Sequence, residues 1–147
     1  MTADDTHVHL SITVDRDTVM AGLTFTNNSG GTAYIDRING SLDGVIRNHV
    51  FSIRTDGVLV PYRGDLAKRR RPGLEDVVAL QPGASVTATA DLTREYAFLP
   101  GTHDYQVSYS AFHQFPNRPG FVCLASGSVS FVFTGTDESE SRLASIP

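Results

Sequence analysis

Short segments of strict two-residue alternation run through most of this 147-residue chain, and they constrain its fold more than any other feature. In the first such segment Val8, Leu10 and Ile12 alternate with polar residues. Successive side chains of a β-strand point to opposite faces, so this pattern indicates a strand with one buried face. The same alternation predicts strands at residues 19–25, 86–92, 105–111 and 129–133. Short segments bounded by turn residues add further strands at residues 32–38, 51–55, 58–62 and 77–80.

Residues typical of turns separate these segments. Asp56-Gly57 lies between two predicted strands and indicates a two-residue hairpin, because glycine accepts the positive φ of a type I′ turn. Pro61 has no backbone N–H, which places its strand at a sheet edge or a bulge. Repeated short strands with such turns predict an all-β fold, and within that class an immunoglobulin-like antiparallel β-sandwich of about seven to nine strands.

The length fits one domain, since domains are commonly about 150 residues long. We expect a flexible N-terminus over residues 1–6, the β-sandwich over residues 7–134 and a disordered, acidic and serine-rich tail over residues 135–147. Tyr105 fits the tyrosine that hydrogen-bonds back across a corner in immunoglobulin-like folds, and an ordinary half-buried strand tyrosine fits it equally well. The predicted core residues are Leu10, Ile12, Leu23, Phe25, Phe51, Ile53, Val107, Phe131 and Phe133.

Composition excludes several classes of partner. The 12 basic and 16 acidic residues give a net charge of −4, which makes a general nucleic-acid binder improbable. No apolar run approaches the roughly 18 residues of a membrane span. No signal-peptide pattern opens the chain, which leaves a cytoplasmic protein and one secreted after processing both open. The single cysteine excludes an intrachain disulfide and a cysteine-rich zinc site.

Candidate catalytic groups are few. His7 and His9 share one face of a predicted strand, where a metal pair is geometrically possible, but no third ligand is specified. His113 near Cys123 would suit nucleophilic chemistry. The apolar context of Cys123 instead predicts a buried, inert thiol. Because HExxH, GxSxG, P-loop and GxGxxG strings are all absent, we expect no catalytic residue, no bound metal and no cofactor.

The sharpest local feature is a basic segment. Residues 63–71 hold five basic residues and one acid, so the remainder of the chain carries a net charge of −8. Such a segment can dock an acidic protein surface, bind phosphate groups, present a dibasic cleavage site or simply be a solvated loop. We take the segment and the aromatic residue before it as candidate partner-binding residues: Tyr62, Arg63, Lys68, Arg69, Arg70 and Arg71.

Three segments in the middle of the chain carry a family resemblance. They are Phe51-x-Ile53-x-x-Asp56-Gly57-x-x-Val60-x-Tyr62-x-Gly64-x-x-x-Lys68-Arg69, then Leu80-x-Pro82-Gly83-x-Ser85-Val86 with Asp91-Leu92-x-x-x-Tyr96, and Gly101-Thr102-x-x-Tyr105-x-Val107-x-Tyr109. They resemble the region before the catalytic domain in deuterolysin-like (aspzincin) metalloendopeptidases. The resemblance covers roughly residues 8–134, and its first segment is the most specific.

In that family the corresponding region is a β-sandwich pro-domain, which assists folding of the zinc protease and keeps it inactive. The protease domain carries HExxH and a GTxxD motif. This chain lacks HExxH, and Tyr105 stands where GTxxD has its aspartate. The resemblance therefore implies a stand-alone pro-domain-like protein that inhibits or chaperones a metalloprotease.

Two other functions remain open on the residues alone. One is a β-sandwich binding module for carbohydrate or for another protein partner. The absence of tryptophan weakens the carbohydrate interpretation, although tyrosine and phenylalanine can also form stacking platforms. The other is a small metal-dependent enzyme built around the histidines, against which the missing catalytic motifs count.

Overall fold

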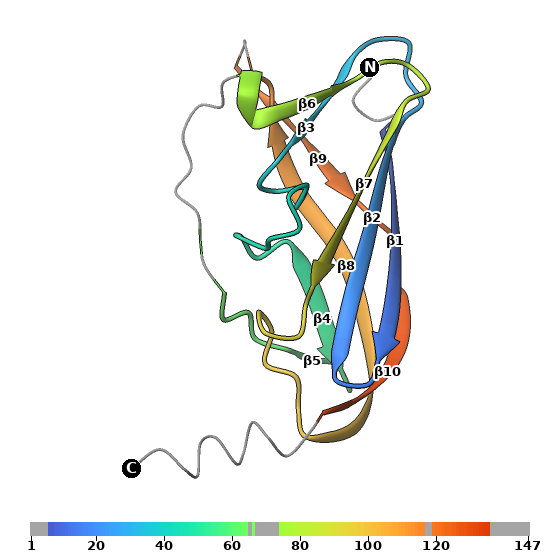
Figure 1. The fold of residues 1–147 in the computed structure, drawn as a ribbon, viewed down its shortest axis with the longest axis vertical. Coiled ribbons are helices and arrows are strands. Elements are labelled where there is room, and N and C mark those ends of the chain that lie inside the picture. Colours follow the sequence, from blue (N-terminus) through green and yellow to red (C-terminus); the bar gives the residue numbers. More distant parts are fainter. Residues whose placement is uncertain (1–5, 65, 67–73, 117–118, 136–147) are drawn as a thin grey trace.

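The computed structural model describes residues 6–64, 66, 74–116 and 119–135 (Figure 1). This described part contains ten β-strands and one short 3₁₀ turn, η2 (Leu74–Asp76), with no α-helix. All of its strand pairings are antiparallel. The prediction of an all-β fold is therefore confirmed, while the immunoglobulin-like assignment within that class stays a prediction.

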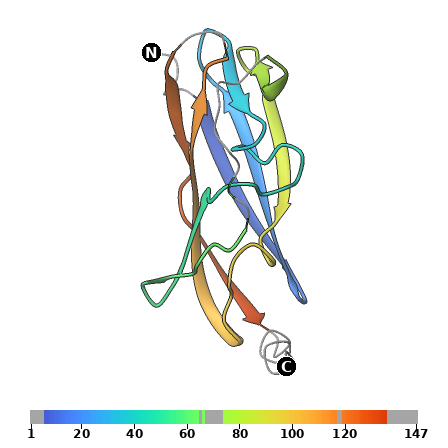
Figure 2. The same cartoon turned by 90° about the vertical axis from the view of Figure 1, so that its left-hand side faces the viewer.

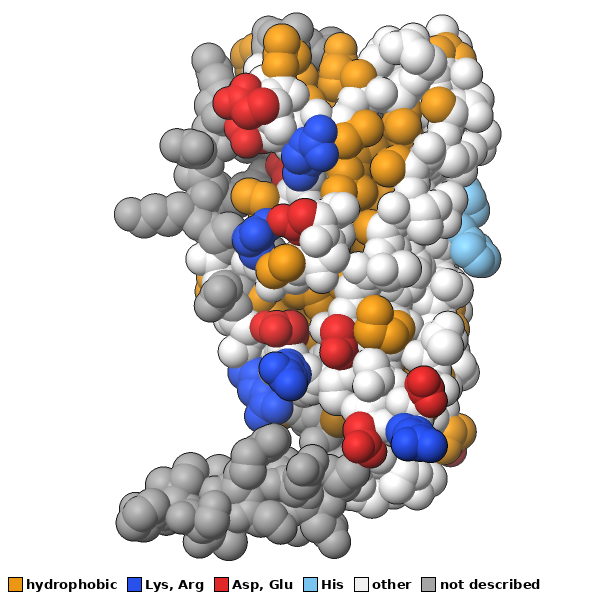
Figure 3. Space-filling model, in the orientation of Figure 1, with side chains coloured by type: hydrophobic (Ala, Val, Ile, Leu, Met, Phe, Trp, Pro, Cys, Tyr) orange, Lys and Arg blue, Asp and Glu red, His pale blue; other side chains and the backbone are white. Residues whose placement is uncertain are grey.

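The first sheet has three strands in the order β1-β2-β7. They are β1 (Thr6–Asp15), β2 (Thr18–Asn27) and β7 (Ser85–Asp91). Hydroxyl groups line its outer face, and neighbouring strands share hydrogen bonds there, such as the one between Thr26 Oγ1 and Ser85 Oγ at 2.8 Å. In the space-filling view this face is mostly white, with charged side chains gathered near its lower end (Figure 3).

The second sheet has the order β10-β8-β4-β5, and β9 also pairs with β8. Its strands are β4 (Phe51–Thr55), β5 (Val58–Leu59), β8 (Gly101–Gln114), β9 (Phe121–Ala125) and β10 (Val129–Gly135). Asp56 and Gly57 connect β4 to β5 with φ angles of 52° and 76°. Positive φ at both central residues defines the type I′ turn that the sequence predicted.

A third, two-stranded sheet pairs β3 (Ala33–Asp36) with β6 (Val77–Leu80). It lies near the end of the molecule where β8 finishes (Figure 1). The two larger sheets face each other as layers, which the turned view shows (Figure 2). This sandwich-like arrangement places the outer faces of β1-β2-β7 and of the second sheet on opposite sides.

The strands β9 and β10 run along the same side of β8, with a one-residue bulge between them. Ala125 pairs with Ser110, and Val129 pairs with Val107. Three residues between β9 and β10, 126–128, therefore lie opposite only two residues of β8, 108 and 109. Within the bulge, Ser126 Oγ accepts the backbone N–H of Tyr109 at 3.0 Å, and the Ser126 N–H donates to the Tyr109 carbonyl at 2.9 Å. The Ser126 hydroxyl thereby takes the place of the backbone carbonyl that would accept the Tyr109 N–H in a regular pair of strands.

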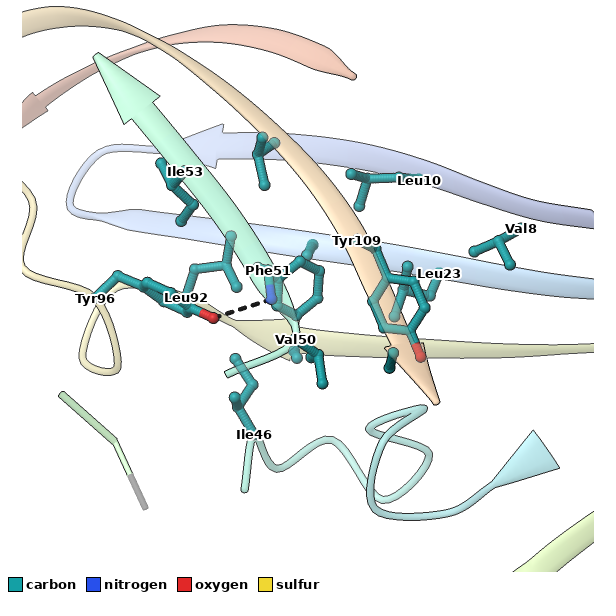
Figure 4. Packing of buried hydrophobic residues seen from close by; sticks show 14 of the residues in the cluster. Val8, Leu10, Leu23, Ile46, Val50, Phe51, Ile53, Leu92, Tyr96 and Tyr109 are labelled. Atoms are coloured by element: carbon teal, nitrogen blue, oxygen red, sulfur yellow. Dashed lines mark hydrogen bonds between the residues drawn. The ribbon is translucent and has the colours of Figure 1, made fainter. Parts of the chain in front are cut away.

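One hydrophobic core joins the two large sheets (Figure 4). Seven of the nine predicted core residues are buried, namely Leu10, Leu23, Phe25, Phe51, Ile53, Val107 and Phe133. Ile12 and Phe131 are only partly buried, contrary to the prediction. Phe131 lies on the edge strand β10, where its ring stacks on Tyr105 at a centroid distance of 5.4 Å and is covered only in part.

Two buried tyrosines fasten connecting segments to this core. The Tyr105 hydroxyl accepts the Leu99 N–H at 3.1 Å, as the interpretation of Tyr105 as a corner tyrosine predicts. The Tyr96 hydroxyl accepts the Phe51 N–H at 3.1 Å, drawn as a dashed line in Figure 4. Each phenol thus satisfies a backbone donor that the sheet leaves unpaired.

Candidate functional site

The structure places Tyr62 and Arg63 just beyond β5. Tyr62 is half-buried; its ring stacks on His49 at 5.2 Å with an interplanar angle of 7° and lies 5.1 Å from Tyr96. Arg63 is exposed, and its Nε donates to the Arg94 carbonyl at 3.2 Å. The other candidate residues, Lys68 to Arg71, lie outside the described residues.

The predicted strand at residues 58–62 is shorter than expected. It ends at Leu59, and the chain then pairs with the turn after β7 through an Ala97 N–H to Pro61 carbonyl bond of 3.0 Å and a Tyr62–Tyr96 bridge. Pro61 lacks an N–H, so it cannot continue the ladder. The backbone edge near Tyr62 is therefore already paired, which leaves little room for a partner strand to add there.

Side chains, by contrast, remain available at this edge. Val58 and Leu59 are 65% and 42% exposed, and Pro61 and Arg63 are exposed as well. We call these four residues the β5 surface. Val58 and Leu59 are consecutive strand residues, so their side chains point to opposite faces of β5. The edge therefore offers an apolar group on each face, and the cation of Arg63 follows along the chain.

A second surface, the outer groove, lies on the outer face of the second sheet. Its volume is about 590 Å³, and the residues that line it include Asn48, His49, Leu66, Phe112, Gln114 and Phe121. Phe112 and Phe121 are 53% and 56% exposed, with ring centroids 4.8 Å apart. The groove is not visible in the sequence, because Phe121 belongs to an unbroken apolar run, Phe121-Val-Cys-Leu-Ala125, that shows no alternation. The signal was the inward-outward alternation of β8, which places Phe112 outside.

A buried hydrogen-bond network anchors one wall of the groove to the core. His113 Nδ1 accepts the Asp36 N–H at 2.9 Å, so the neutral ring carries its proton on Nε2, 2.8 Å from the Tyr109 hydroxyl. That hydroxyl donates to the Asn39 carbonyl at 2.6 Å. The Asn39 side chain in turn donates to the Phe112 carbonyl at 2.7 Å. The network fixes the segment around Asn39 against β8.

The environment of these phenols changes their acidity. Burial raises the pKa of Tyr109 well above the ordinary value for a phenol, and the nearby Asp36 carboxylate acts in the same direction. Burial also raises the pKa of Tyr96, although the hydrogen bond from Phe51 opposes the effect. Both phenols therefore stay protonated at neutral pH and act as hydrogen-bonding groups of the core.

The histidines and the cysteine do not converge. His7 and His9 are exposed on the outer face of β1, and no three His, Cys, Asp or Glu residues of the described part could together hold a metal ion. Cys123 is exposed, so the prediction of a buried thiol is wrong. It lies opposite Phe112 on the outer face, whereas His113 points into the core. The two side chains therefore do not form a nucleophile–base pair.

Comparisons with known proteins leave the family open. No protein-family model matches the chain, and no curated protein matches its sequence. The resemblance to the deuterolysin pro-domain region therefore stays a prediction from the residues quoted above. No helix within the described ranges is both long and apolar enough to cross a membrane.

Proposed function

We propose that this chain is a non-catalytic protein-binding module and that its β5 surface is the contact. The observation that carries the proposal is the exposure of Val58 and Leu59 on the sheet-edge strand β5, a few residues before Arg63. A water-exposed apolar pair of this kind gains free energy when a partner covers it, at roughly 25 cal/mol for each Å² removed from water.

Charge defines the kind of partner. Arg63 begins the basic segment, which carries a net charge of +4 in a chain of net charge −4. An acidic protein surface is the complement of such a segment. The resemblance to the deuterolysin pro-domain region adds a specific candidate, a metalloprotease that the module inhibits or helps to fold. Binding through side chains is favoured over strand addition, since the backbone beyond Leu59 is already paired.

The test measures association with a deuterolysin-type metalloprotease and compares two matched variants. Val58→Asp places a charge in the proposed contact, and we expect it to weaken binding at least about tenfold. Val132→Asp is the control, because Val132 is also an exposed strand residue, at 54%, but lies on β10 at the opposite edge of the same sheet. Circular dichroism checks that both variants keep the fold.

Two outcomes would contradict the proposal in different ways. Equal affinity of Val58→Asp and the parent chain would exclude the β5 surface as the contact. If the metalloprotease does not bind at all, the protease assignment fails. The module assignment then requires a purified acidic protein that binds the parent chain and loses affinity with Val58→Asp.

A further inference from the structure

The outer groove exposes two phenyl rings to solvent. Phe112 and Phe121 lie edge to face at an interplanar angle of 71° and are each more than half exposed. Leu66, 73% exposed, also lines the groove. Apolar side chains that stay in water in this way commonly mark a ligand or partner site.

Polar groups meet these rings in the same groove. The Asn48 amide donates to Asn39 Oδ1 at 2.8 Å, and the Asn39 amide donates to the Phe112 carbonyl, so both amides are held in place. Gln114 also lines the groove, and its Oε1 is buried without a hydrogen-bond partner among the described residues.

The groove is suited to an uncharged ligand. Among the described residues that line it, none is Asp, Glu, Lys or Arg, and His49 is the only titratable side chain. A charged ligand would lose hydration there without gaining an ion pair. The volume of about 590 Å³ lies within the range of small-molecule sites.

The backbone beneath the groove argues against an added peptide strand. The residues of β8 from Ser110 to Gln114 pair with β9 on one side. On the other side the Ser110 N–H donates to the Val50 carbonyl, and the Phe112 carbonyl accepts from Asn39. A peptide that binds by strand addition needs a free strand edge, which this part of β8 does not offer.

We propose that the outer groove binds a neutral saccharide. A pyranose ring has an apolar C–H face, which the phenyl rings of Phe112 and Phe121 can cover, and hydroxyl groups at its rim. Hydroxyls both donate and accept, which matches the amides of Asn48 and Gln114. This site is separate from the β5 surface, so the proposal does not depend on the proposed protein partner.

The experiment titrates the full chain with neutral gluco-, manno- and chito-oligosaccharides and follows amide shifts by NMR. We expect binding that shifts the amides of Phe112 and Gln114, and a loss of affinity of at least about tenfold in Phe112→Ala. Gln114→Leu removes the acceptor without removing a ring and should also weaken binding. Val132→Ala truncates an equally exposed apolar residue outside the groove and should bind like the parent chain.

Several results would overturn the proposal. These are no shift with any of the neutral sugars at millimolar concentration, equal affinity in Phe112→Ala and the parent chain, or tighter binding of a sulfated or uronic-acid oligosaccharide. Occupation of the groove by a peptide or protein partner in place of sugar would also overturn it. Val58→Asp separates the two sites, because it should leave saccharide binding unchanged even if it removes a protein partner.

Discussion

His113 makes two hydrogen bonds that only one form of its ring can make. Nδ1 accepts the Asp36 N–H, and Nε2 is 2.8 Å from the Tyr109 hydroxyl, which itself donates to the Asn39 carbonyl. The ring is 1% exposed, so water does not replace these partners. At the scale of single residues, this histidine is a structural group of the core.

Removing the ring nitrogens should therefore cost stability. We predict that His113→Leu lowers the free energy of unfolding by about 1–3 kcal/mol, because the Asp36 N–H loses its acceptor in a buried place. Urea unfolding followed by circular dichroism measures the change. His9→Leu, at an exposed position of β1, should change the free energy by less than about 0.5 kcal/mol. Equal effects of the two substitutions would contradict the structural role of His113.

The buried tyrosines make stability depend on alkaline pH. Burial raises the pKa of Tyr96 and Tyr109, whereas an unfolded tyrosine titrates near pH 10. Above about pH 10 the unfolded state therefore binds fewer protons than the folded state, and stability falls as pH rises. Each of the two phenols should contribute up to about 1.4 kcal/mol per pH unit.

Urea unfolding at a series of pH values above about 9 measures this slope. With five tyrosines and no tryptophan, tyrosinate absorbance reports ionisation directly. Tyr96→Phe should reduce the slope by the contribution of one phenol while lowering stability at neutral pH, because the Phe51 N–H loses its acceptor. A stability that does not change across this pH range would contradict the burial of these phenols.

At the scale of elements, β10 shows how two inward side chains of one edge strand can differ in burial. Phe131 and Phe133 both point inward, but only Phe133 is fully buried, with an exposure of 3%. Phe133 packs against Phe98 at a centroid distance of 5.3 Å. The alternation of β10 identifies the inward face correctly, but the extent of cover depends on which neighbouring elements reach each position.

This difference gives a matched pair of substitutions. We predict that Phe133→Ala lowers the free energy of unfolding by about 3–5 kcal/mol, since it leaves a cavity in the core. Phe131→Ala should cost roughly half as much, because part of its ring already contacts water. Urea unfolding of both variants provides the measurement. A larger loss for Phe131→Ala than for Phe133→Ala would show that the burial of the two rings is assigned in the wrong order.

Local signals in the sequence predicted most of the strands and the hairpin turn. Asp56-Gly57 was sufficient for its turn, because the turn type depends on the φ angles of those two residues alone. The outer groove was not predictable in this way. It requires Phe112 and Phe121 to meet across two strands, and β9 has no alternation to reveal which of its residues face outward. The exposure of Cys123 was missed for the same reason.

The candidate contact with a partner was predicted only in part. Tyr62 and Arg63 lie together beyond β5, but pairing with the turn after β7 closes the backbone edge there. That pairing brings together residues about thirty positions apart, and a pattern in one segment does not encode it. Val58 and Leu59 were predicted as strand residues, and their exposure follows from the edge position of β5.

At the scale of the whole molecule, charge is distributed unevenly. The chain carries a net charge of −4, whereas residues 63–71 carry +4. Opposite charges attract over about 10 Å at moderate ionic strength, before any side chain makes contact. In the proposed complex, the basic segment would affect how fast the acidic partner arrives, and the β5 surface how long it stays bound.

The last prediction concerns this steering. Reversing Arg69, Arg70 and Arg71 to Glu changes the net charge from −4 to −10. These residues lie outside the described part of the chain, but steering depends on charge more than on contact geometry. We predict that the triple variant associates with the metalloprotease at least about tenfold more slowly at low salt, and that the difference shrinks as salt screens the charges. Its dissociation rate should stay close to that of the parent chain.

Stopped-flow or surface plasmon resonance at several salt concentrations measures both rates. Val58→Asp is the converse variant, because it should raise the dissociation rate more than it slows association. Equal association rates of the triple variant and the parent chain at low salt would exclude the basic segment from partner recognition.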